Sequence, residues 1–159
     1  MRAWQMPLYG VDSNVRPMIS NFRHELRKIV QAQDDIEATA ISYPLAEKLK
    51  NEPDAIDAVP IILELMEQHP TFDFGVPGPL VHFVERFYQH GYEDMLCVSF
   101  TRRPALHTVM MMHRLINGST GEMKRKYIEI LGTALSRPEI EQVVRNCADH
   151  YYRYHTQKT

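Results

Sequence analysis

Residues 53–91 read PDAIDAVPIILELMEQHPTFDFGVPGPLVHFVERFYQHG, and this stretch decides the fold class. Its apolar residues recur at three- and four-residue steps, which is the spacing of an amphipathic helix. We expect one helix that opens at Asn51 with Pro53 in its first turn, is interrupted at Pro60 and ends at Pro70. Residues 71–79 are dense in Gly and Pro and predict a rigid corner. A second helix then runs to Gly91.

The same helical spacing continues toward the N-terminus. Residues 18–30 form one apolar stripe, and a second helix is expected over residues 34–49. Asp34 or Asp35 is suited to cap that second helix, because a short carboxylate accepts hydrogen bonds from the first-turn amides. Pro44 falls inside this helix and is expected to kink or split it.

Toward the C-terminus the pattern predicts four more helices. Residues 92–101 form a short helix, and Pro104 begins another that ends at Gly118 in a left-handed conformation. Residues 119–122 and 136–139 both read Ser-x-x-Glu, the spacing of a capping box, and predict the starts of the last two helices.

No stretch alternates with the two-residue period of a strand, so the predicted fold class is all-α. Residues 53–91, 92–118 and 119–155 each predict one helix pair. Their spacing favours stacked antiparallel helix pairs of HEAT-like type, with an irregular helical bundle as the alternative. We expect residues 1–159 to form a single helical domain whose residues 1–15 are irregular.

Charge is unevenly distributed along the chain. Residues 34–73 hold ten acids and only two strong bases, Lys48 and Lys50, for a net charge of −8. The remaining residues hold 16 bases and 10 acids, for a net charge of +6. Such a field favours attraction of a basic partner, although charges on a helix are most often only solvated. The binding candidates are therefore acids of this segment: Asp54, Asp57, Glu64, Glu67, Asp34, Asp35 and Glu37.

The sequence gives little support for a catalytic or metal-binding site. Cys147 and His150 share the spacing of two ligands but lack a third, so no metal site is predicted. Cys97 could pair with His107 or His113, but the sequence has no motif that would activate it as a nucleophile. The loop at residues 75–79 contains two prolines, which remove amide donors for an anion. No cofactor is predicted, and the expected protein is not an enzyme.

Composition limits the partner and the compartment. Nucleic-acid-binding proteins usually have a high pI and a broad basic surface. Here the sequence pI is about 6.4 and the basic cluster at residues 124–126 is short, so direct nucleic-acid binding is not expected. Apolar runs such as residues 109–112 are too short to cross a membrane, and the three consecutive methionines there suit a buried helix. Two distant cysteines and no signal-like start predict a soluble cytoplasmic protein.

Two segments carry a family resemblance. These are residues 56–85, which contain the corner FGVPGPLVHFVE, and residues 103–117, which read RPALHTVMMMHRLIN. Together they resemble small helical, HEAT-like immunity proteins of bacterial polymorphic-toxin and contact-dependent growth inhibition systems. The resemblance covers roughly residues 35–149 and rests on structural corners, so it assigns no contact residue.

This resemblance implies a cytoplasmic protein that binds and neutralises a cognate toxin. Many such toxins are nucleases with a basic active-site cleft, which an acidic surface would occupy. One competing hypothesis is a helical protein–protein adaptor that does not inhibit its partner. Another is an enzyme, such as a metal-dependent hydrolase that uses the histidines.

Overall fold

The computed structural model describes residues 17–75 and 77–157, and every regular element within them is helical. The predicted irregular segment at residues 1–15 lies outside the described residues, as does the side chain of Met18. The elements, in chain order, are α1 (Pro17–Ile29), α2 (Asp35–Lys50), the 3₁₀ turn η1 (Ala55–Asp57), α3 (Ala58–Gln68), α4 (Pro79–Glu85), α5 (Tyr92–Arg102), α6 (Leu106–Asn117), α7 (Gly121–Thr133), the 3₁₀ turn η2 (Ala134–Ser136) and α8 (Gln142–Thr156).

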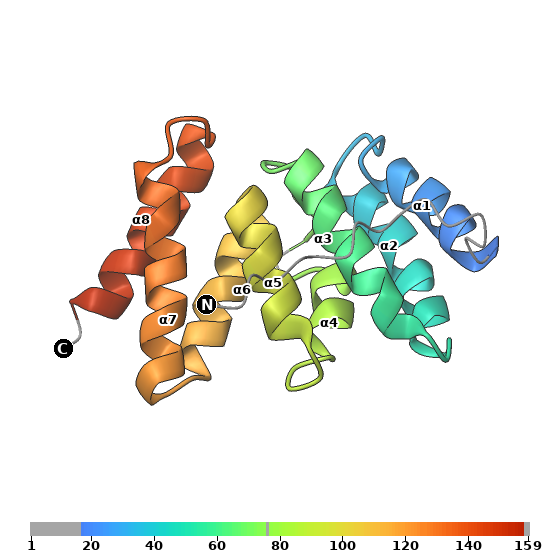
Figure 1. Ribbon diagram of the computed structural model, residues 1–159. Coiled ribbons are helices and arrows are strands. Elements are labelled where there is room, and N and C mark those ends of the chain that lie inside the picture. The colour runs from blue at the N-terminus through green and yellow to red at the C-terminus, as the bar shows by residue number, and fades with distance from the viewer. Residues whose placement is uncertain (1–16, 76, 158–159) are drawn as a thin grey trace.

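The helices form two layers in a stack of antiparallel pairs (Figure 1). In one layer α1 contacts α3, α3 contacts α5, and α5 contacts α7. In the other layer α2 contacts α4, and α6 contacts α8. Each odd-numbered helix also packs on the even-numbered helix that follows it. The predicted all-α fold of stacked helix pairs is therefore confirmed, with α1 and α2 as an additional pair at one end.

The core lies between the two layers. Large buried side chains fill it from α1 to α6: Leu26, Ile29, Leu49, Ile62, Met66, Phe74, Leu80, Phe83, Leu96, Phe100 and Met111. Leu131 of α7 and Val144 of α8 continue it. The methionine run of α6 behaves as predicted, because Met111 and Met112 are fully buried and Met110 is half-buried. Burial of this apolar surface is the main force that holds successive pairs together.

The predicted corner between α3 and α4 is fixed by hydrogen bonds to α6. The Leu106 amide donates to the Pro70 carbonyl at 2.8 Å, and Nε2 of the buried His107 donates to the Gly75 carbonyl at 2.8 Å. Gly75 has a φ of +93°, a conformation that favours glycine. Gly78 has an ordinary φ of −75° and caps α4. Its lack of a side chain matters because a Cβ atom there would lie 1.8 Å from the Phe74 carbonyl oxygen.

The structure corrects the predicted course of the chain around α3 and α4. The helix does not open at Asn51, because a turn and η1 precede α3. Pro60 lies in the first turn of α3, where its missing N–H breaks no helical hydrogen bond. The next helix ends at Glu85, and turns carry the chain to Gly91.

Helix ends elsewhere also differ from prediction. Gly118 has a φ of −80°, so it is not left-handed. Neither predicted capping box forms, because the Ser119 hydroxyl donates to the Leu115 carbonyl and the Ser136 hydroxyl donates to the Thr133 carbonyl. In contrast, the predicted cap of α2 is confirmed, with Asp34 accepting from the Glu37 amide at 2.8 Å.

Candidate functional site

Two of the predicted binding acids are engaged in ion pairs between helices of one layer. Glu64 of α3 pairs with Arg23 of α1 at 2.9 Å. Glu67, one turn further along α3, binds Arg102 of α5 through two hydrogen bonds of 2.8 and 3.1 Å. The side chain of Glu67 is only 12% exposed. These pairs join α3 to basic residues of the helices on either side of it. Part of the negative charge of residues 34–73 is therefore neutralised within the fold.

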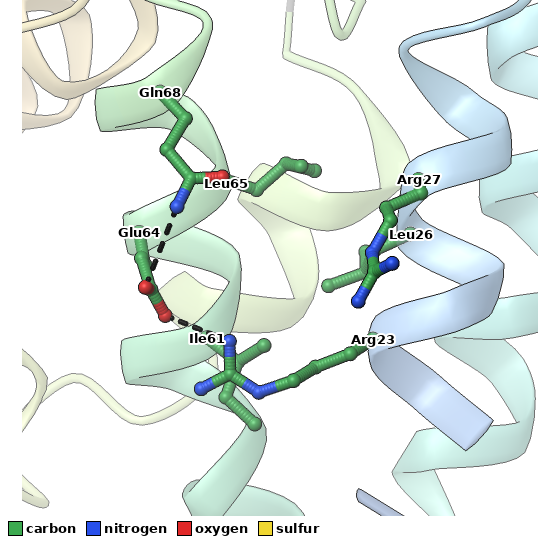
Figure 2. Close-up of a pocket in the computed structure, with 7 residues that line it drawn as sticks. All are labelled: Arg23, Leu26, Arg27, Ile61, Glu64, Leu65 and Gln68. Atoms are coloured by element: carbon green, nitrogen blue, oxygen red, sulfur yellow. Dashed lines mark hydrogen bonds and ion pairs between the residues drawn. The ribbon is translucent and has the colours of Figure 1, made fainter. Parts of the chain in front are cut away.

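The surroundings of Glu64 are a shallow pocket between α1 and α3 of about 250 Å³ (Figure 2). Arg23 and Arg27 contribute one wall, and Glu64 and Gln68 contribute the other. Within the part of the chain that the structure describes, Arg27 has no ion-pair partner. Two guanidinium groups therefore face one carboxylate, and the local charge is positive rather than acidic.

We expect the Glu67–Arg102 pair to stabilise the fold measurably. Glu67→Gln should lower the free energy of unfolding by roughly 1 kcal/mol, because a two-bond arginine–carboxylate contact at a mostly covered site is lost. Asp57→Asn, at an exposed residue, should change it by less than about 0.5 kcal/mol. Urea denaturation of the two variants checks this difference. Equal effects would show that the Glu67 pair contributes nothing.

The remaining candidates lie near the two ends of α2. Asp34, Asp35 and Glu37 are exposed where α2 begins. Asp54, which is half-buried, and the exposed Asp57 follow the end of α2. Figure 1 shows these two places at opposite edges of the stack. Since α2 has 16 residues, its ends are about 22 Å apart. The acidic segment is therefore divided between separate places and does not form one face.

The cluster at the start of α2 keeps its negative charge. Asp34 caps α2, and Glu37 accepts a hydrogen bond from the Gln33 amide at 2.7 Å. Neither contact neutralises a carboxylate. Among the described residues, no Lys or Arg forms an ion pair with Asp34, Asp35 or Glu37. Among the predicted binding acids, these three therefore form the cluster whose negative charge is not balanced by an ion pair.

Apolar side chains also face solvent on α2, which the sequence reasoning did not single out. Ile36 is 76% exposed and Tyr43 is 59% exposed. The buried residues of α2 are Ala38, Ser42, Ala46 and Leu49, which define the opposite side of the helix. In the sequence, Ile36 and Tyr43 fall outside the helical stripe formed by residues 38, 42, 46 and 49. The sequence alone does not show that this stripe is the buried one, because that depends on the neighbouring helices.

Histidines and tyrosines gather where α6 meets α8. His113 stacks on Tyr151 with ring centroids 4.1 Å apart, and its Nδ1 lies 2.9 Å from Nε2 of His155. The Asn117 amide donates to the other ring nitrogen of His113 at 3.1 Å, which leaves the proton on Nδ1 for donation to His155. Burial lowers the pKa of His113, and nearby His150 lowers it further. The arrangement holds a neutral imidazole between the two helices.

Acid is expected to destabilise the protein through the buried His107 and the half-buried His113. Burial lowers the pKa of His107 and of His113 below the ordinary value of 6.5. The unfolded chain therefore binds more protons between the folded and unfolded pKa values, so stability falls as the pH drops below about 6.5.

Urea denaturation at pH 7.5 and pH 5.5 measures this effect. His107→Gln keeps an N–H donor for the Gly75 carbonyl but does not titrate, so it should reduce the loss of stability between the two pH values. If the variant and the wild type lose the same amount, His107 is not a source of the pH dependence.

The groups considered for catalysis are placed in unreactive settings. Burial raises the pKa of the Cys97 thiol to about 11 and also raises the pKa of Cys147. His107 is occupied by the Gly75 carbonyl rather than by a cysteine. Within residues 17–75 and 77–157, no group of three or more His, Cys, Asp or Glu side chains is placed to hold a metal ion. Nor does any helix in these ranges combine the length and apolar character needed to cross a membrane.

Comparison of the chain with protein-family models, with curated proteins and with solved structures found no match.

Proposed function

We propose that this protein is an immunity protein that binds and neutralises a nuclease toxin domain with a basic active-site cleft. The observation that carries the proposal is the uncompensated carboxylate cluster at the start of α2, formed by Asp34, Asp35 and Glu37. The sequence resemblance to helical immunity proteins supports the same function. A cleft that binds nucleic-acid phosphates is lined with Lys and Arg, which a carboxylate cluster attracts.

The acids of residues 34–73 would have different roles in this function. Glu64 and Glu67 are held by arginines and contribute chiefly to the fold. The α2 cluster projects its field into solvent and would raise the association rate with a basic toxin. Salt should weaken this effect, since the Debye length is about 8 Å at physiological ionic strength. Affinity then depends on the contacts made after encounter.

Stacked helix pairs also suit a helical adaptor, because such stacks present extended surfaces to partners. The two functions differ in their consequence for the partner. An adaptor binds without blocking activity, whereas an immunity protein abolishes it.

Co-expression with the product of the reading frame directly upstream tests the proposal. The toxin domain of that product should arrest growth when it is expressed alone. Co-expression of the present chain should restore growth, and the two proteins should co-purify. A complex without protection would favour the adaptor. Absence of both a complex and protection would remove the proposed function.

A further inference from the structure

Three exposed residues form a ridge along the outer side of α2. Ile36, Ala40 and Tyr43 follow one another at steps of four and three residues, so they share one helix face. All three are exposed, and the fractions for Ile36 and Tyr43 are the two highest among large hydrophobic side chains in the described residues. We call these three residues the α2 ridge.

A backbone acceptor lies on the same ridge. Pro44 is inside α2 and has no N–H, so the Ala40 carbonyl lacks the donor that residue i+4 normally supplies. Ala40 and Pro44 are both exposed, so this carbonyl belongs to the solvent-facing side of α2. A partner that places an N–H donor there would satisfy an acceptor that the helix itself leaves open.

The charge around the ridge specifies the partner. Asp35 and Glu37 flank Ile36 in sequence, and Asp34 precedes them, so one end of the ridge is strongly acidic. At the other end Glu47 pairs with Lys50 and is neutralised. A second copy of this chain that packed its α2 parallel to this one would bring two acidic clusters together, which is unfavourable. A basic protein surface with an apolar recess complements the ridge.

We infer that the α2 ridge is the surface on which the toxin docks. Ile36 and Tyr43 pack into the apolar recess, the Ala40 carbonyl accepts a hydrogen bond from a Lys or Arg of the toxin, and the acids form the rim. An apolar centre with a charged rim is the usual organisation of a protein interface, and tyrosine is enriched among its energetically dominant residues. The inference rests on the proposed function and names its contact surface.

A double variant tests the apolar anchors. Ile36→Ser with Tyr43→Ser removes both side chains at exposed positions, so folding should be retained. Val143→Ser with Met123→Ser is the matched control, because these residues are 50% and 45% exposed on α8 and α7. Affinity is measured by calorimetry against the purified domain from the upstream reading frame. We expect a loss of roughly 100-fold for the ridge variant and less than about threefold for the control.

Pro44→Ala tests the open carbonyl and separates binding from folding. The alanine restores a helical N–H for the Ala40 carbonyl and removes a proline from the helix interior, so the melting temperature should rise by roughly 5 °C or more. Toxin affinity should fall several-fold, because the acceptor is then occupied. An increase in stability with unchanged affinity would show that the carbonyl makes no contact.

The outcomes distinguish the inference from the function on which it rests. If the wild-type chain neither binds the upstream domain nor protects against it, both the docking surface and the immunity function are ruled out. If it binds and protects while the ridge double variant keeps wild-type affinity, the docking surface is wrong and the immunity function stands. If the double variant changes only the self-association seen in analytical ultracentrifugation, the ridge binds a second copy and the inference is overturned.

Discussion

Gly78→Ala is expected to destabilise the protein by at least about 3 kcal/mol, because the added methyl group has no space. A Cβ atom at Gly78 would lie 1.8 Å from the Phe74 carbonyl oxygen and 2.8 Å from the carbonyl carbon. The carbonyl cannot easily retreat, since the Phe74 side chain is buried and its ring packs against Phe72 and His107. The change should therefore displace the whole corner between α3 and α4.

Gly91→Ala is the matched control for this substitution. Gly91 has a φ of +99°, but a Cβ atom there would meet nothing within 4 Å. It should cost only the strain of a left-handed alanine, roughly 1–2 kcal/mol. Thermal and urea denaturation of both variants measure the difference. If Gly78→Ala costs no more than Gly91→Ala, the close approach at the corner is not what requires glycine.

Reversing two charges at the start of α2 is expected to slow association with the toxin domain by about tenfold or more at low salt. Asp35→Lys with Glu37→Lys replaces two of the three exposed acids of the cluster with bases. The difference from wild type should shrink as salt is added, because screening weakens the long-range field. Stopped-flow association rates at several ionic strengths measure both effects. Circular dichroism must first show that the variant retains its helices, since Lys is less favourable than an acid at a helix start.

Glu122→Lys with Glu129→Lys provides the control for net charge. Both residues are exposed on α7, at the opposite end of the stack from α2, and the change in total charge is the same (Figure 1). This variant should stay within about threefold of the wild-type rate. If the two double variants slow association equally, total charge matters and the α2 cluster has no special role. Asp57→Lys alone then tests the other end of α2 without breaking an ion pair between helices.

The fold could be predicted because its determinants are local. Apolar spacing within residues 53–91 specifies two helices, and the Gly- and Pro-rich corner specifies their antiparallel arrangement. Helix ends were less predictable, because hydroxyl groups have several acceptors within reach. Ser119 fits a capping box in sequence, yet it hydrogen-bonds to the Leu115 carbonyl of the preceding helix. Such competition between local partners is decided by the packing of the turn.

The candidate site was only partly predictable, because its charges depend on distant partners. The acidic segment is visible in the sequence, but Arg23 is 41 residues from Glu64, and Arg102 is 35 residues from Glu67. No local pattern indicates that these two acids are neutralised while Asp35 is not. The exposure of Ile36 and Tyr43 likewise depends on which side of α2 faces α1 and α4.

Inhibition of the purified toxin domain tests the central claim most directly. Nuclease activity of the domain from the upstream reading frame is measured while the present protein is added in increasing amounts. We expect activity to fall in proportion to added protein and to reach zero at a one-to-one ratio, with the inhibited complex isolated by gel filtration. A stable one-to-one complex with full nuclease activity would contradict the immunity function, and so would undiminished activity with no complex.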